Sequence, residues 1–188
     1  FISALQGIKV EVITQKELTK AACCDLAGCF ETQGTIQAQT TNLLLNSKEL
    51  RILGLSGVYN QILVDGMPMI LGSSFTYGIS SIPGTLVDQI FVAKGANSVL
   101  QGFESISGQV NVVLKEPKPE KEKFLFNAYL NSFGEKHLNA NFSTLLGKNW
   151  KSLSAVHMVQ PAGKRDRDAD TFLDLPLLTR VMVYQKFT

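Results

Sequence analysis

The chain has 188 residues, of which 45% are apolar, and it carries a formal net charge of +2 at pH 7. That length can hold one or two domains with a sizeable core, and the apolar content is that of a globular protein rather than a disordered one. The near-zero charge and the lack of a basic, aromatic-rich motif exclude nucleic acid as a partner, and no run reaches the roughly 18 apolar residues that a membrane-spanning helix needs.

The first predicted strand is Lys9–Thr14, where polar and apolar side chains alternate. A helix is expected next, because Thr14 and Glu17 have the spacing of an N-terminal capping box and apolar residues then recur at helical intervals. Gly28 is expected to end this helix. The following segment, Thr32–Asn46, is rich in Thr, Gln and Asn, which indicates either irregular structure or a weakly paired strand.

Three cysteines, Cys23, Cys24 and Cys29, lie within seven residues. An odd number cannot pair completely within one chain, and the spacing matches no common zinc motif. Three alternatives remain open: buried small side chains, one local disulfide, or a metal site.

A second predicted strand, Glu49–Leu55, is followed by two apolar runs, 61–64 and 67–71, with Asp65 and Gly66 between them. Asp-Gly between apolar runs predicts a β hairpin, because both central residues of a type I′ turn need a positive φ. The Ser- and Gly-bearing stretches 72–77 and 78–84 are expected to be loops.

The stretch Ile90–Lys115 is expected to complete the first domain as a strand, a glycine-punctuated turn and a second strand. Gly95, Gly102 and Gly108 are its predicted turn points, and apolar residues alternate after them as far as Leu114. A phosphate-binding loop is not supported, because the G-x-x-x-x-G-K-[ST] pattern is absent.

A charged segment with two prolines, Glu116–Lys123, is predicted to be an exposed linker. Four strands are expected after it, in the segments Phe124–Leu130, Leu138–Thr144, Trp150–Gln160 and Leu177–Phe187. Their residues alternate between apolar side chains and polar ones, among them Asn and Ser. On periodicity alone, this pattern fits equally well a membrane barrel with its apolar face toward lipid and a soluble sheet with that face inward.

No catalytic pattern is present, and an enzyme is not expected. There is no nucleophile elbow, and His137 and His157 fall on separate predicted β elements without a metalloprotease motif.

The long polar connection Pro161–Asp174 contains four aspartates in a D-x-D-x-D-x-x-x-D pattern: Asp166, Asp168, Asp170 and Asp174. Carboxylates at every second position can converge on Ca²⁺, which makes the loop 164–174 a candidate calcium site. Thr171 stands where an EF-hand loop has Gly, however, and neighbouring basic residues offset the negative charge. A solvated charged loop is the alternative, and no other cofactor is indicated.

Taken in order, several segments resemble the plug domain of TonB-dependent outer-membrane receptors. That family has an opening strand and helix, an I-R-G-[LF] segment, an L-[IV]-D-G-[VM]-P hairpin and a glycine-rich closing segment. This chain has VEVIT (Val10–Thr14), ILGL (Ile52–Leu55), ILVDGMP (Ile62–Pro68) and IFVAKGANSVLQGFESISGQVNVV (Ile90–Val113). The resemblance covers residues 9–115. The cysteine-bearing Ala21–Gln33 is similar to a subgroup seen in Bacteroidota receptors.

The resemblance implies an α+β plug domain, a small mixed sheet with short helices, at residues 9–115, after a linker at 1–8. A second linker would occupy 116–122. Residues 123–188 would then be about the first four antiparallel strands of a large outer-membrane β-barrel, incomplete in this chain. The short Gly147–Asn149 would be a periplasmic turn, and Pro161–Asp174 an extracellular loop.

The implied function is import of a scarce nutrient, such as a siderophore, a metal complex or cobalamin, across the bacterial outer membrane. TonB, acting through a segment upstream of this chain, would displace the plug. Other implied partners are outer-membrane lipid, the extracellular ligand, and other outer-membrane proteins or lipoproteins. The alternatives are a non-transporting, receptor-like subunit of an outer-membrane complex and a free-standing soluble α+β protein.

Ligand contact is expected from outward loops, at Tyr77, Gln101, Phe103 and Glu104, although packing of plug against barrel explains these residues equally well. Gln101 stands where the family has Tyr, which puts a family-level contact there in doubt.

Three further positions depart from the family. Leu53 stands where Arg is common and Phe91 where Glu is common. Because both charges are replaced by apolar groups, we expect the two side chains to pack inside the plug instead of forming a charge pair. Ser107 replaces the first Gly of a pair.

Overall fold

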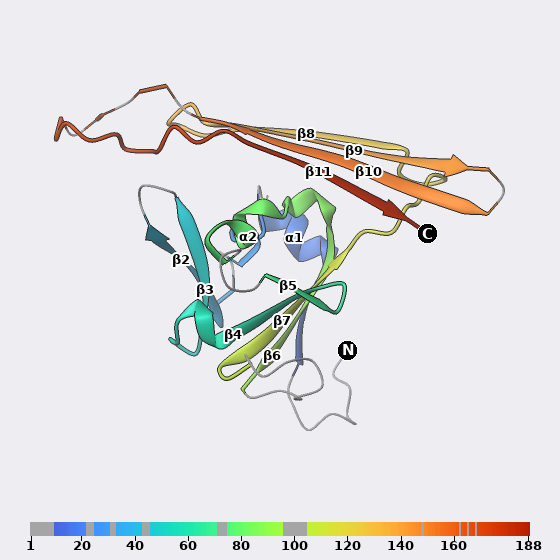
Figure 1. The fold of residues 1–188 in the computed structure, drawn as a ribbon, viewed down its shortest axis with the longest axis horizontal. Helices are drawn as coiled ribbons and strands as arrows, with labels where there is room; N and C mark the ends of the chain where they lie inside the picture. The colour runs from blue at the N-terminus through green and yellow to red at the C-terminus, as the bar shows by residue number, and fades with distance from the viewer. Residues whose placement is uncertain are drawn as a thin grey trace. The chain divides into compact units, whose positions relative to one another are not determined.

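The computed structural model describes residues 10–21, 25–30, 33–42, 46–70, 75–95, 105–147, 149–161, 163–164, 166–167 and 169–188 (Figure 1). The chain divides into two compact units, one formed by residues 1–41 and 47–115 and the other by residues 42–46 and 116–188. Among the described residues, no helix combines the length and the apolar content needed to cross a membrane.

The first unit is a mixed sheet with short helices. Its elements are β1 (Val10–Ile13), α1 (Gln15–Ala21), the 3₁₀ helix η1 (Gly28–Phe30), β2 (Ile36–Asn42), β3 (Ser47–Ile52), η2 (Gly57–Tyr59), β4 (Asn60–Val64), β5 (Met67–Ile70), α2 (Phe75–Ser81), η4 (Gly84–Leu86), β6 (Val87–Lys94) and β7 (Gly108–Leu114). Five strands form a sheet in the order β1-β6-β7-β4-β5, in which β4 and β7 run parallel, and β2 pairs with β3 separately. The helix α1 packs against β6, and α2 packs against β3 and β5.

The core of this unit is built from apolar residues that meet in rows across the sheet. Val92, Val110 and Ile62 are register partners on β6, β7 and β4, and each is at most 1% exposed. Full burial of one such side chain stabilises a fold by about 1.5–3 kcal/mol. The alternation predicted for Ile90–Lys115 is therefore confirmed, and this stretch supplies most of β6 and the whole of the central strand β7.

Helix α1 begins where the capping-box spacing predicts it. Glu17 Oε2 accepts hydrogen bonds from Thr14 N at 2.7 Å and from Thr14 Oγ1 at 3.0 Å. These bonds, the backbone one above all, hold the pKa of Glu17 below its usual value. The prediction that Gly28 ends the helix is wrong, because Gly28 begins η1. Asp25 Oδ1 accepts from Gly28 N at 2.9 Å and thereby starts a new turn.

The loop predicted across 72–84 is wrong for residues 75–81, which form α2. Gly78 lets this helix approach β5, since a Cβ at that position would lie 2.8 Å from Ile70 Cγ2. Packing therefore decides this helix against a composition rich in Ser and Gly.

Of the three predicted turn glycines, Gly95 is confirmed, with φ at +86° and its N–H donated to Ser107 O at 2.8 Å. Gly108 is not a turn residue but the first residue of β7. A Cβ there would lie 2.7 Å from Ala93 O, so the position needs Gly for close strand packing. Gly102 lies outside the described residues.

The second unit holds four strands in one antiparallel sheet, coloured yellow to red in Figure 1. They are β8 (Phe124–Leu130), β9 (Lys136–Leu146), β10 (Trp150–Gln160) and β11 (Arg180–Phe187), each paired with its neighbour in sequence. The strand expected from Leu177 begins three residues later, at Arg180.

One face of this sheet buries polar side chains together with Leu153, Ala155 and Val159, and the other face exposes large apolar side chains. Asn139 and His157 are 1% exposed, whereas Phe142 is 50% exposed. The strand register places the exposed apolar side chains on one face, here called the apolar face: Phe124, Phe126, Leu130, Leu138, Phe142, Leu146, Trp150, Val156, Val181, Val183 and Phe187. The soluble-sheet alternative, with the apolar face inward, does not describe this unit.

Candidate functional site

The connection from β3 to β4 is a tight turn with an unusual backbone. Leu53 has a φ of +55° and Gly54 a φ of +78°, and Leu55 N donates to Ile52 O at 3.0 Å. The left-handed conformation costs a residue with a Cβ roughly 1–2 kcal/mol, so the surrounding contacts must hold Leu53 in place.

Glu49 on β3 supplies those contacts. Its Oε1 accepts from Arg51 Nε at 2.6 Å, and its Oε2 accepts from Ser56 Oγ at 3.0 Å and from Gly57 N at 3.1 Å. Burial raises the pKa of Glu49, but the hydrogen bonds from these three residues outweigh it, and the pKa stays below its usual value. The Glu49 carboxylate thus hydrogen-bonds residues on both sides of the turn, Arg51 before it and Ser56 and Gly57 after it.

Gly57 fits tightly beneath this carboxylate. A Cβ at position 57 would lie 2.9 Å from Glu49 Cβ and 3.2 Å from Leu50 O. A larger residue would therefore push η2 away from β3 and loosen the turn.

The segment that leads into β7 is fastened to the same turn. Tyr59 O accepts from Ile106 N at 3.0 Å, from Ser107 N at 3.1 Å and from Ser107 Oγ at 3.0 Å. The Ser107 hydroxyl also hydrogen-bonds Asn60 Oδ1. The departure from Gly at position 107 therefore has a physical role, because the added hydroxyl holds β7 beside β4.

These fixed segments present a group of exposed apolar side chains, here called the apolar apex: Leu53, Leu55, Val58, Tyr59 and Ile106. Their exposed fractions are 64%, 43%, 61%, 45% and 59%. Large apolar groups held outward by a tight polar framework are typical of a contact surface.

The apolar apex corrects the expectation for Leu53 and Phe91. Leu53 is not buried, because it lies at the corner of the turn, and Phe91 is only half-buried in β6, opposite Val12 and Asn111. The lost charges at these positions have not been exchanged for packing in the interior of the first unit.

The basic side chains of β3 and β6 are paired with carboxylates. Besides the Arg51–Glu49 contact, Lys94 Nζ lies 3.3 Å from Glu11, and Lys48 Nζ lies 3.9 Å from Asp25. Beside the apex, the described residues of these two strands therefore offer no unpaired cation.

The predicted Asp-Gly hairpin is confirmed, with β4 and β5 antiparallel and φ angles of +49° at Asp65 and +80° at Gly66. The turn is also clamped to β7. Asp65 Oδ1 accepts from Leu114 N at 2.9 Å, and Asn111 Oδ1 accepts from Gly66 N at 3.0 Å. The aspartate therefore both permits the turn and joins it to the central strand.

Of the predicted ligand contacts, Tyr77 lies on α2 and is 41% exposed, and its carbonyl accepts from Ser81 Oγ at 2.6 Å. Gln101, Phe103 and Glu104 lie outside the described residues. Sequence reasoning missed the apolar apex, for which the short apolar pairs beside Gly54 and Gly57 were the available signal.

The aspartates of the loop 164–174 bond to the loop itself. Asp166 accepts from the backbone N–H groups of Asp170 and Thr171, at 3.3 and 2.9 Å, and Asp174 Oδ2 accepts from Arg167 N at 3.2 Å. Asp168 lies outside the described residues. Within the part of the chain that the structure describes, no three His, Cys, Asp or Glu side chains cluster as metal ligands.

Of the three cysteines, Cys23 and Cys24 lie outside the described residues. Cys29 is 1% exposed, and its Sγ donates to Asp25 O at 3.4 Å. Its environment is that of a buried small side chain.

Comparison with known proteins matches residues 6–109 to the family described as TonB-dependent receptor plug domain. The vitamin B12 transporter BtuB of Vibrio cholerae is 24% identical over 139 residues, which cover 74% of this chain and 23% of the transporter.

Two solved receptors share the fold. The alcaligin outer membrane receptor FauA of Bordetella pertussis has a TM-score of 0.65 at 20% identity, covering 84% of this chain and 27% of that one. The ferric-catecholate import receptor Fiu of E. coli also has a TM-score of 0.65, at 16% identity, covering 89% of this chain and 23% of that one. This chain thus spans about a quarter of the length of each relative.

Proposed function

The chain belongs to the TonB-dependent receptor plug domain family, and on that premise we propose that it is the plug and barrel start of an importer for a scarce nutrient. The observation that carries the proposal is the succession of two unlike sheets. A mixed sheet with the family's hairpin precedes antiparallel strands whose apolar face is exposed. The named relatives are transporters and receptors rather than enzymes.

Receptors of this family lie in the bacterial outer membrane with the plug inside a β-barrel. In that setting, the apolar face of β8–β11 contacts lipid, and the opposite face, with Asn139 and His157, lines the lumen.

The apolar apex is the proposed ligand contact of the plug, together with Tyr77 and the predicted Gln101, Phe103 and Glu104. Five exposed apolar groups on the β3–β4 connection and on the segment before β7, without an unpaired cation on β3 or β6, suit a ligand with an apolar face. Cobalamin and metal complexes with organic shells have such faces.

Transport requires that the plug be displaced, and TonB is the proposed source of force. The strand β1 has four residues and lies at the edge of the sheet, paired with β6. A pull on the segment before β1 therefore meets a short edge strand before it reaches the central strands.

Uptake by cells tests this proposal. A strain lacking the full-length gene should lose uptake of labelled cyanocobalamin, ferric siderophore or glycan, and the wild-type gene should restore it only when TonB is present. Restored cells that take up none of these in a TonB-dependent way would favour the alternative, a receptor-like subunit of an outer-membrane complex.

Two matched variants test the apex. Val58 and Met67 are both 61% exposed, but only Val58 belongs to the apolar apex. Val58→Glu should weaken ligand binding roughly tenfold, because a carboxylate must be desolvated against an apolar ligand face. Met67→Glu should leave binding unchanged. Equal effects of the two would exclude the apex as the contact.

Calcium in the loop 164–174, with Asp166, Asp168, Asp170 and Asp174 as ligands, remains a separate proposal. The carboxylates already accept backbone hydrogen bonds, so affinity would be in the weak range of about 10⁻⁴–10⁻³ M known for extracellular sites. Calorimetric titration of the full-length receptor with Ca²⁺ should show heat of binding that Asp166→Asn removes, and absence of heat in the wild type ends the proposal.

Membership of a Bacteroidota subgroup, suggested by Ala21–Gln33, is likewise a proposal.

A further inference from the structure

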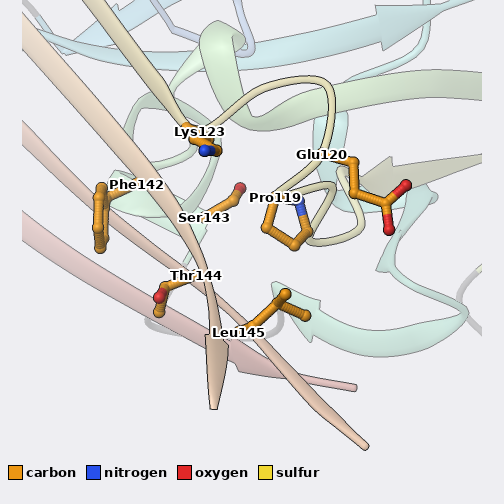
Figure 2. A pocket seen from close by; sticks show the side chains of 7 residues that line it. All are labelled: Pro119, Glu120, Lys123, Phe142, Ser143, Thr144 and Leu145. Carbon is orange, nitrogen blue, oxygen red and sulfur yellow. The ribbon is translucent and has the colours of Figure 1, made fainter. Parts of the chain in front are cut away.

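The linker after β7 folds into a turn beside the end of β9. Lys118 O accepts from Lys121 N at 3.1 Å and from Glu122 N at 2.8 Å, and Lys123 O accepts from Ser143 N at 2.9 Å. Between this turn and β9 lies a pocket of about 570 Å³ (Figure 2). Its lining residues are Pro119, Glu120, Lys123, Phe142, Ser143, Thr144 and Leu145.

Two opposite charges stand at the rim of this pocket. Glu120 and Lys123 are both exposed, and no ion pair joins their side chains to each other or to another described residue. In Figure 2 the Glu120 carboxylate points away from β9, while Lys123 lies nearer the start of β8. The rim therefore offers one anionic and one cationic group, and the hydroxyl of Ser143 points toward the linker.

One wall of the pocket continues into the apolar face of the sheet. Phe142 lines the pocket and is the register partner of Phe124 on that face. Trp150 and Phe187 lie near the same end, since Trp150 pairs with Leu146 and Phe187 with Ser152. These four aromatic side chains are 50–63% exposed. Aromatic residues collected at one end of an apolar strand face mark a membrane–water interface.

We propose that this pocket binds the head group of a zwitterionic phospholipid, with the acyl chains along the apolar face. Lys123 bonds the phosphate, and the exposed side chain of Glu120 turns toward the pocket when the lipid binds and bonds the ammonium group of the same head group. The acyl chains then leave past Phe142 and Phe124. The inference rests on the proposed function, because it needs the apolar face to lie in a membrane.

The charge arrangement selects the class of lipid. An anionic head group without an ammonium would satisfy Lys123 but would meet the Glu120 carboxylate with a like charge. A free phosphate or a soluble head group would pair with the charged groups at the rim but would leave Phe142 and the rest of the apolar wall exposed to water. A zwitterionic head group on acyl chains satisfies both parts of the site.

Native mass spectrometry of the delipidated full-length receptor, titrated with phosphatidylethanolamine or phosphatidylglycerol, tests this site. The wild type should retain one phosphatidylethanolamine roughly tenfold more tightly than phosphatidylglycerol, because Glu120 hydrogen-bonds the ammonium of the first lipid and repels the anionic head group of the second. Lys123→Glu should weaken that binding roughly tenfold. Glu120→Lys should reverse the preference toward phosphatidylglycerol.

Lys121→Glu is the matched control, because it makes the same charge change in the same turn at a residue that does not line the pocket. It should retain the lipid as the wild type does. Equal retention of both lipids by the wild type, or equal loss with Lys121→Glu and Lys123→Glu, would overturn the proposal. So would displacement of the lipid by millimolar phosphoethanolamine, which lacks the acyl chains.

The result is independent of transport. The titration contains neither nutrient nor TonB, so a receptor that binds the lipid but supports no uptake would refute import as the function and leave the membrane setting and the lipid site standing. A receptor that supports uptake but shows no lipid preference would refute the lipid site and leave import as the function.

Discussion

The plug sheet and the β8–β11 sheet share an alternating pattern of polar and apolar residues, but they differ in which of these residues are buried. In β6 and β7, the apolar members of the alternation, such as Val92 and Val110, are buried. In β9, the polar members Asn139 and Asn141 are buried, and the apolar members Leu138 and Phe142 are exposed. Alternation thus fixes which residues share a face, but the medium on each side decides which face is covered.

The two sheets also differ in how their strands are joined. The strands β8 to β11 pair in sequence order, whereas β4 pairs in parallel with β7, about fifty residues away. Polar side chains reinforce that distant pairing, as in the bond from Gln109 Nε2 to Gln61 Oε1 at 2.8 Å. The plug is therefore held by specific long-range bonds, and the barrel strands by a continuous local ladder.

The largest predicted effect comes from placing a charge on the apolar face. Val183 is 74% exposed on that face, and Val183→Lys should destabilise the receptor in the membrane by about 2–4 kcal/mol if it lies near the bilayer centre. The amount of folded receptor recovered from outer membranes should fall accordingly. Met182→Lys, on the opposite face, should cost much less, and equal losses would mean that the two faces have not been assigned correctly.

Gly108→Ala should have the next largest effect, confined to the plug. The added Cβ would meet the backbone at Ala93 O, and overpacking of this kind costs about 1–3 kcal/mol. Hydrogen exchange of the full-length receptor should quicken in β6 and β7 but not in β9 and β10. Gly163→Ala is the control, since nothing lies within 4 Å of its Cβ position.

Asp65→Ala should loosen the hairpin by about 1–2 kcal/mol, because it removes the bond to Leu114 N and places Ala at a positive φ. Exchange should quicken in β5 and at the end of β7. Asp65→Asn keeps an accepting oxygen and tolerates the left-handed conformation, so it should restore most of the protection. An Asn variant as labile as the Ala variant would show that the charge matters rather than the bond.

The smallest effect concerns acid stability. Because the pKa of Glu49 lies below its ordinary value of 4.5, its stabilisation is present above pH 4.5 and is lost as the pH falls through the lowered pKa. Glu49→Gln should therefore lower the thermal unfolding midpoint of the plug at pH 7 and bring it closer to the wild type at pH 3. An unchanged difference between the two proteins across this range would contradict the assignment.

Several features were predictable from the sequence because they depend on neighbouring residues. The Asp65-Gly66 turn follows from the φ angles that these residues accept, and β10 occupies the predicted range Trp150–Gln160. The start of α1 follows from the spacing of Thr14 and Glu17. In each case the chemistry lies within a few residues or within one strand's alternation.

Other features depended on partners distant in the chain. The helix α2 forms because Gly78 fits against Ile70, Gly108 is required by Ala93 and Ile52, and Leu53 points outward because Glu49 fixes its turn. The order of residues was enough to predict most of the strands, the faces that their side chains share and the hairpin. Tertiary packing settled which face is covered and which apolar residues form the apex, because burial depends on what packs against a residue and not on its own side chain.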